Sequence, residues 1–369
     1  MAGIPTSRAA SLVVSNEPVT RDQFYNGNIK VERAAIVLRL AKTWFRIGSL
    51  EMLTVNSETE LLKSTVEFII RNYFETIDPK DTDCILALFQ EIVHATARLI
   101  AQWQSVGFTH GVCNTDNFSL LSITIDYGPF GFLESYDPNF VPNTSDDEGR
   151  YSYANQPDIG AFNLDKLRIS LLPLLTKKQA KQASTILKDY AGIYKSEYMK
   201  LFMKKLGFKC LDTYTEDDEQ FVAILFKIME DTKADFTMTF RELSELTLDQ
   251  IELSIKQEKN IQGSWAVIEL INHEWFAKWV KVYRIKLKDM SLSEDERQAV
   301  MLATNPRYVL RNWIAQLAID HTERNEFTEV NSVLQILKSP YTYSKVAEEK
   351  GFASPPPNWA SKLKVSCSS

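Results

Sequence analysis

Apolar residues recur every three or four positions along most of this chain, which is the spacing of helices that bury one face. In segment 82–106 one apolar stripe is formed by Ile85, Leu88, Phe89, Ile92, Val93, Leu99, Ile100 and Trp103, with Thr96 as its polar member. Asp81 or Thr82 can cap the start of this helix and Gly107 can end it. The stripe is expected to be core. The same spacing predicts further helices at 58–76, 177–206, 217–231, 242–257, 262–286, 293–303 and 308–319.

Two segments near the start are typical of strands instead. Residues 9–14 (AASLVV) and 34–41 (AAIVLRLA) are rich in small and β-branched side chains. Asn26-Gly27 between them suits a reversing turn, so the two strands are predicted to pair. A further strand is predicted at 119–125, after an irregular loop at 110–117.

These elements predict a mainly helical α+β protein. Residues 1–50 form a small β part, and residues 51–338 form a helical body that includes the loops 110–128 and 129–163. The second loop is dense in Gly, Pro, Asn and Asp, which favour turns. Residues 339–369 are a proline-stiffened tail that carries Cys367.

Composition excludes several classes of protein. The net charge of −6 and the lack of a basic tract argue against a nucleic-acid partner. No apolar run approaches the length of a membrane span. The opening "MAGIPTSRAASLVV" has the pattern of neither a signal peptide nor a transit segment. The four cysteines (84, 113, 210 and 367) are too few and too scattered for a disulfide framework or a zinc site, which indicates a reducing compartment.

The stretch "HGVCNTDNFSLLSITIDYG", residues 110–128, is the strongest candidate for chemistry. Protein kinases hold magnesium with the asparagine of H-R-D-x-x-x-x-N and the aspartate of D-F-G. Asn117 lies seven positions after His110, and Asp126 precedes Tyr127-Gly128, so both spacing and order agree. Val112 occupies the position of the kinase base, and Asp116 stands beside the asparagine instead. The alternatives are a structural turn at Asp126 and a helix cap or Asx-turn at Asp116-Asn117. His110 is predicted to bond backbone rather than to act as an acid or base.

Two arginines could bind phosphate. Arg39 interrupts an apolar strand and Arg46 follows it in "WFRIGS". A guanidinium group suits phosphate oxygens, but salt bridges to Glu32 or Glu51 are the alternative.

The chain closely resembles the selenoprotein O family, which is protein-kinase-like and transfers AMP rather than phosphate to protein hydroxyls. The resemblance rests on "HGVCNTDN", "IDYGPFGFLESYDP", "SDDEGRYSYANQPDIGAFNL", "GIPTSRAASLVVS", "VLRLAKTWFRIGS", "NPRYVLRNWIAQLAI" and the closing "VSCSS". It implies that Asp116 is the proton acceptor and that Asn117 and Asp126 bind Mg²⁺ or Mn²⁺. It also implies that Asp126, Arg39 and Arg46 contact ATP, which lies inverted relative to kinases so that a Ser, Thr or Tyr hydroxyl attacks the α-phosphorus.

The resemblance carries expectations about the rest of the protein as well. The family's phosphate loop, its lysine and the glutamate that pairs with it precede the motif in which this chain begins. That implies a truncated small β lobe beside a large helical lobe. Two alternatives to the enzyme stay open: a non-catalytic pseudokinase scaffold, and a helical interaction module. Cys367 stands where vertebrate members carry selenocysteine, which implies a redox role; an idle thiol is the alternative. The family implies a mitochondrial location, with the cytoplasm as the alternative.

Overall fold

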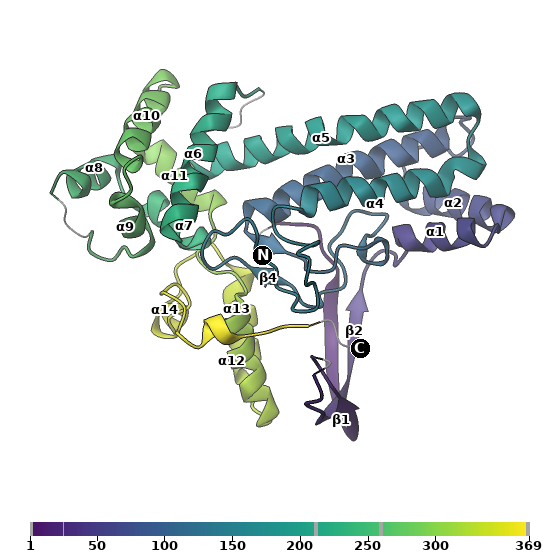
Figure 1. The fold of residues 1–369 in the computed structure, drawn as a ribbon, viewed down its shortest axis with the longest axis horizontal. Helices are drawn as coiled ribbons and strands as arrows, with labels where there is room; N and C mark the ends of the chain where they lie inside the picture. Colours follow the sequence, from purple (N-terminus) through teal and green to yellow (C-terminus); the bar gives the residue numbers. More distant parts are fainter. Residues whose placement is uncertain (1–2, 25, 210–212, 258–260, 367–369) are drawn as a thin grey trace.

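The computed structural model describes residues 3–24, 26–209, 213–257 and 261–366 (Figure 1). These residues form a mainly helical protein with two small antiparallel sheets, as the hydrophobic spacing predicts. The helices are α1 Ile47–Val55, α2 Thr59–Tyr73, α3 Cys84–Ser105, α4 Gln156–Leu171, α5 Lys177–Lys205, α6 Glu216–Thr232, α7 Phe236–Glu245, α8 Leu248–Gln257, α9 Ala266–Ile271, α10 Phe276–Asp289, α11 Glu294–Thr304, α12 Asn312–Glu323, α13 Thr328–Lys338 and α14 Lys345–Glu349.

The described residues form separate hydrophobic clusters, and helix α3 lies at the centre of the first of these cores. It packs between α4 and α5, which run alongside it in Figure 1. Its stripe residues Leu88, Phe89 and Ile92 are fully buried, which confirms the prediction that the stripe is core. By length and composition alone α3 could cross a membrane, which the sequence analysis did not anticipate. More than half of that apolar window is buried against other helices, so packing within the protein accounts for its composition.

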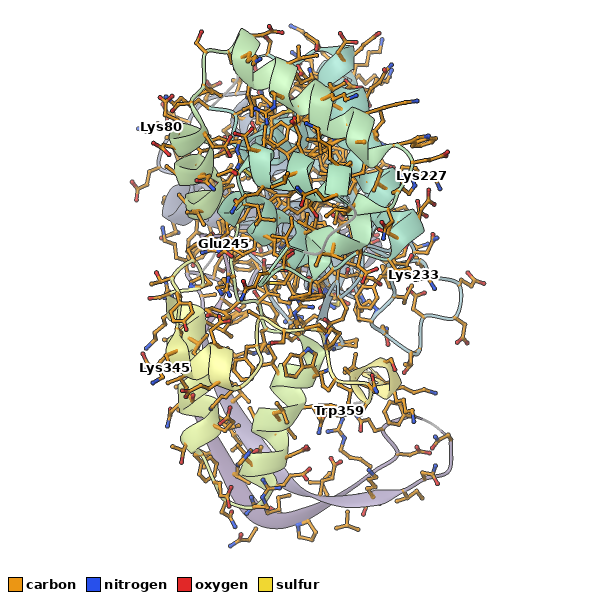
Figure 2. The ribbon with its side chains drawn as sticks, turned by 90° about the vertical axis from the view of Figure 1, so that its left-hand side faces the viewer. Lys80, Lys227, Lys233, Glu245, Lys345 and Trp359 are labelled. Carbon is orange, nitrogen blue, oxygen red and sulfur yellow. The ribbon has the colours of Figure 1, made fainter. Side chains whose placement is uncertain are left out.

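Helix α5 joins this first core to a second one. Its N-terminal half contributes Ala183 and Tyr190 to the packing around α3, whereas Phe202 packs among aromatic side chains of α6 and α7. A third cluster lies around α12 and α13 and includes Trp313 and Phe352. Figure 2 shows the interior crowded with side chains, while labelled lysines such as Lys80 and Lys233 lie at the periphery.

The predicted strand pair is confirmed. Strands β1 (Arg8–Arg21) and β2 (Lys30–Leu40) form an antiparallel hairpin in which Arg8 faces Leu40 and Arg21 faces Lys30. The hairpin projects from the helical body (Figure 1), and apolar side chains on both faces are exposed, among them the neighbours Leu12 and Val13, which point to opposite faces. The second sheet joins β3 (Phe108–Thr109) to β4 (Gly131–Phe132).

The predicted strand at 119–125 is wrong. The chain reverses there in a turn, in which the amide of Ser122 donates to the carbonyl of Ser119 at 2.9 Å and Ser122 takes a φ of +49°. Isolated bridges link Phe118 with Thr124, Arg46 with Ser119, and Thr6 with Thr124. Pairing with segments distant in the chain therefore overrides the local strand propensity.

Other boundaries also differ from the predictions. Helix α4 begins at Gln156, inside the predicted loop 129–163. The single helix predicted at 242–257 is two, because Leu246 is extended at ψ 141° and ends α7. The helix predicted at 262–286 likewise divides into α9 and α10. Helix α12 starts four residues later than predicted, because Arg311 caps it in an extended conformation.

Candidate active site

Two amide side chains from α4 hold the segment that contains His110. Gln156 is fully buried; its Oε1 accepts from the His110 amide at 2.9 Å, and its Nε2 donates to the Phe108 carbonyl at 2.9 Å. Asn163 Nδ2 donates to the Cys113 carbonyl at 2.7 Å. Both residues lie where the sequence predicted only loop. The sequence analysis missed them because they bind residues about 50 positions away in the chain, and a contact at that distance leaves no local sequence pattern.

His110 has the structural role that was predicted. Its ring is buried, and Nε2 lies 2.9 Å from the Ile125 carbonyl. Burial lowers the pKa of this imidazole, which keeps the ring neutral. The hydrogen bond joins the start of the motif to the residue immediately before Asp126.

Asp116 and Asn117 lie in a short 3₁₀ turn, Thr115–Asn117, which the Asn114 side chain caps by accepting from the Asp116 amide at 3.1 Å. The Asx-turn that was the alternative for Asp116-Asn117 is formed by the Asn114 side chain instead. The buried Asn117 donates through Nδ2 to the Val112 carbonyl at 3.0 Å, which leaves its Oδ1 outside that bond. The exposed Asp116 carboxylate lies against Gly48 of α1: a Cβ on Gly48 would be 2.1 Å from Asp116 Oδ1. Gly48 is a further site residue that the sequence analysis missed.

Asp126 is held in an unusual backbone conformation. Its φ is +57°, in the left-handed region, and its carbonyl accepts from the Gly128 amide at 2.8 Å. A non-glycine residue in this region is uncommon, and aspartate is one of the few that tolerate it. Next to it, Tyr127 hydrogen-bonds through its hydroxyl to Thr6, so the N-terminal segment is tied to this turn.

Arg39 of β2 reaches Asp126. Its Nη1 lies 3.3 Å from Asp126 Oδ1, and its guanidinium lies 5.2 Å from the ring centre of Trp44. The alternative partners considered from sequence are otherwise engaged: Glu32 pairs with Arg21 at 3.7 Å, and Glu51 accepts from Thr115 at 2.8 Å. The salt bridges to Glu32 or Glu51 that were the alternative are therefore not formed among the described residues, and Arg39 pairs with the candidate metal ligand itself.

Arg46 is placed by backbone pairing. The amide of Ile47 donates to the Phe118 carbonyl at 2.9 Å, and the amide of Leu120 donates to the Phe45 carbonyl at 3.0 Å. These bonds set Arg46 beside Ser119, two residues after Asn117. Within the described part of the chain, the Arg46 guanidinium forms no ion pair. It is therefore available to bind an anion.

The structure brings these residues together only in part. Phe118 and Thr124 form a bridge between two parts of the motif. Asn117 immediately precedes Phe118, and Asp126 is two residues after Thr124, so the bridge brings their backbones near each other. Among described residues, however, no three His, Cys, Asp or Glu side chains form a group that could hold a metal ion. Any cation here would depend on Asn117 Oδ1, on the Asp126 carboxylate that now pairs with Arg39, and on ligands from outside the chain. A hollow of about 1010 Å³ at the base of the hairpin is lined by Leu120 and Ile123 of the same turn, and by none of the five candidate side chains.

Cys367 lies outside the described residues. The residues just before it are anchored, since Thr144 donates through its amide (2.9 Å) and its hydroxyl (3.0 Å) to the Val365 carbonyl. Next to Thr144, Asn143 Nδ2 donates to the Gly111 carbonyl at 3.3 Å. The tail thus runs beside the support of the 110–117 loop. Of the other cysteines, the buried Cys113 has its thiol pKa raised by burial, which makes it unreactive.

Sequence identity to curated relatives shows the class of protein to which the chain belongs. It is 39% identical to the protein nucleotidyltransferase YdiU of Flavobacterium johnsoniae, over 99% of this chain and 69% of the relative. It is 38% identical to the protein of the same name from Enterobacter sp. (strain 638), over the whole chain and 70% of the relative. The class is thus that of the protein nucleotidyltransferases.

The family is defined more narrowly. The family described as protein adenylyltransferase SelO matches residues 1–338. The chain belongs to this family, as its motifs indicated. Within the family, the site described above contains the candidate catalytic and metal-binding residues.

Proposed function

We propose that this chain binds ATP with a divalent cation at the Arg39–Asp126 pair and transfers AMP to Ser, Thr or Tyr hydroxyls of proteins. The observation that carries the proposal is the 3.3 Å contact between Arg39 and Asp126 in a member of the adenylyltransferase family. Both side chains are more than 40% exposed, so the pair adds only about 0–1 kcal/mol to stability. Each partner can therefore exchange the other for a ligand at little cost.

The donor atoms fit a hard cation such as Mg²⁺ or Mn²⁺. These ions prefer oxygen ligands and retain several waters and phosphate oxygens, so one or two protein oxygens suffice. Asn117 Oδ1 and the Asp126 carboxylate would hold it. When bound, the cation neutralises charge on the phosphates. The guanidinium N–H groups of Arg39 then donate to phosphate oxygens instead of to Asp126, and Arg46 supplies a second guanidinium.

The residues of the chain then have distinct tasks. Asp116 accepts the proton of the attacking hydroxyl, whose oxygen bonds to the α-phosphorus. The bond from the α-phosphorus to the oxygen bridging it to the β-phosphorus breaks, and pyrophosphate leaves. Arg39 and Arg46 offset the negative charge on the phosphates, which is the main contribution a protein makes to such transfers. The proposal includes a protein-kinase-like arrangement, in which residues 1–50, with the hairpin, belong to the small lobe and residues 51–338 to the large lobe. It also includes a mitochondrial location. The redox role of Cys367 stays a prediction.

Labelling from ATP tests the reaction. We expect label from [α-³²P]ATP to enter protein, label from [γ-³²P]ATP not to enter it, and Asp126→Asn to abolish transfer. Asparagine also tolerates positive φ, so this variant removes the charge while the backbone keeps its conformation. The exposed Asp189 of α5 offers a matched control, Asp189→Asn, which should transfer AMP normally.

Two results would contradict the proposal. Incorporation from the γ-phosphate alone would show an ordinary kinase. No labelling together with no shift of the thermal midpoint by Mg-ATP would favour the non-catalytic scaffold, because a ligand of the native state must raise its stability.

A further inference from the structure

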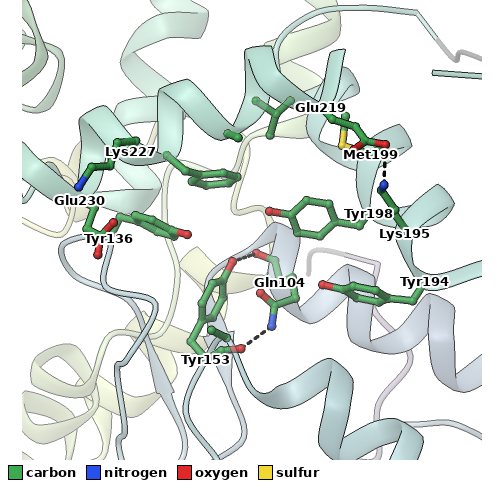
Figure 3. Close-up of a pocket in the computed structure, with 14 residues that line it drawn as sticks. Gln104, Tyr136, Tyr153, Tyr194, Lys195, Tyr198, Met199, Glu219, Lys227 and Glu230 are labelled. Atoms are coloured by element: carbon green, nitrogen blue, oxygen red, sulfur yellow. Dashed lines mark hydrogen bonds and ion pairs between the residues drawn. The ribbon is translucent and has the colours of Figure 1, made fainter. Parts of the chain in front are cut away.

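A second hollow lies away from the Asp126 site, between the C-terminal half of α5, helix α6 and the loop before α4 (Figure 3). Its volume is about 580 Å³, a size typical of small-ligand sites. Four tyrosines line it: Tyr136, Tyr153, Tyr194 and Tyr198. None of the residues assigned above to ATP, metal or proton transfer contributes to the lining.

The tyrosine hydroxyls turn towards one another inside the hollow, as Figure 3 shows. That of Tyr153 donates to the Gln104 carbonyl at 2.8 Å. In the described residues, those of Tyr136, Tyr194 and Tyr198 form no hydrogen bond. Burial raises the pKa of Tyr136 to about 12 and raises the pKa values of the other two as well, so all three are neutral phenols. Neutral phenols offer oxygens that accept hydrogen bonds and ring faces that attract cations.

Of the charged side chains around the hollow, one carboxylate, that of Glu230, has no ion-pair partner among the described residues. Lys195 of α5 pairs with Glu219 of α6 at 2.7 Å, and Lys227 pairs with Asp231 at 2.7 Å. Glu230 forms no ion pair with any described residue, and Figure 3 shows it beside Tyr136. After burial, the charge of Glu230 is the next cause of the raised pKa of Tyr136, which agrees with their proximity. Asp231 and Glu230 both raise the pKa of Lys227, so two carboxylates face one ammonium at this end of the hollow. The net charge of these three groups is −1, and a ligand that approaches Tyr136 therefore meets a negative potential.

We propose that this hollow binds a primary ammonium or guanidinium group, with the charge between Tyr136 and Glu230 and the alkyl chain along Val222 and Phe226. The N–H groups donate to the phenolic oxygens, the ring faces attract the cation and the carboxylate balances its charge. Such a group is present both in free alkylamines and in the lysine and arginine side chains of a protein partner. The site does not depend on the proposed transfer of AMP.

Binding to the full chain, measured by titration calorimetry, tests this site. The probes are n-butylammonium, as a free amine, and Nα-acetyl-lysine N-methylamide, as a side chain in a polypeptide. Their neutral counterparts are 1-butanol and Nα-acetyl-norleucine N-methylamide. We expect a cationic probe to bind about tenfold or more tightly than its neutral counterpart. Preference for the lysine amide over butylammonium would identify a polypeptide as the source, and the reverse a free amine.

Conservative variants separate the site from the fold. Glu230→Gln should weaken cation binding about threefold or more, since an exposed charge pair contributes modestly. Tyr136→Phe and Tyr198→Phe keep the rings but remove the accepting oxygens, and should weaken the cationic probe alone. The exposed Glu274 gives the control Glu274→Gln, which should bind normally. Equal binding of neutral and cationic probes, or unchanged affinity in Glu230→Gln, would overturn the proposal.

Discussion

Replacing Gly48 by alanine tests the position of Asp116 with little disturbance of the fold. Gly48 lies in the first turn of α1, and a Cβ there would be 2.1 Å from Asp116 Oδ1 and 3.1 Å from its Cγ. An ordinary contact begins near 3.4 Å, so the carboxylate must retreat by more than 1 Å. Because Asp116 is exposed and its side chain can rotate, this displacement should cost little stability.

The expected effect on AMP transfer is much larger. A shift of about 1 Å in a reacting group can reduce the rate about 100-fold. Alanine in place of a helical glycine is worth about 0.5–1 kcal/mol in favour of folding, which offsets the cost of moving the carboxylate. We therefore expect Gly48→Ala to transfer AMP about 100-fold more slowly than the parent, while its free energy of unfolding changes by no more than about 1 kcal/mol.

The assay combines initial rates of [α-³²P]AMP incorporation with urea unfolding of the same preparations. Gly192 of α5 provides the matched control, because a Cβ there has no atom within 4 Å. Gly192→Ala should keep the parent rate and gain about 0.5–1 kcal/mol of stability. A parental rate in Gly48→Ala would refute the inference that the Asp116 carboxylate works from the position seen here.

Two further predictions concern buried charges. Lys205 is 3% exposed, and burial lowers its pKa from 10.5 to about 7. Below pH 7 its charge therefore destabilises the folded state in full, by at most about 5 kcal/mol. The unfolded chain binds this proton more tightly, so the stability that Lys205→Met gains over the parent should be largest at pH 7 and below and should shrink towards pH 10; a gain independent of pH in calorimetry would contradict this. Arg311 is 1% exposed and pairs with Asp235 through Nη1 at 2.6 Å and Nη2 at 2.9 Å, so Arg311→Met should lose about 3–5 kcal/mol in urea unfolding by leaving a buried carboxylate unpaired. A loss below about 1 kcal/mol would show that Asp235 finds another partner or becomes protonated.

The sequence by itself determined the helical body and the kind of chemistry. Periodicity is a local property, so the long amphipathic segments that became α3 and α5 could be read with boundaries correct to within a few residues. The motif spacing from His110 to Asn117 and on to Asp126 pointed to a kinase-like metal site. The resemblance of longer motifs along nearly the whole chain pointed to the family that the comparisons show.

Only the tertiary structure decided how the site is assembled. The approach of Asp116 to Gly48, the ion pair between Arg39 and Asp126, and the amides that α4 brings to the 108–113 segment all join residues more than 40 positions apart. The strand propensity of residues 119–125 gave way for the same reason, because pairing with 45–47 and with Thr6 satisfies their backbone in a turn. Contacts of this kind depend on how whole elements pack, which no window of neighbouring residues contains.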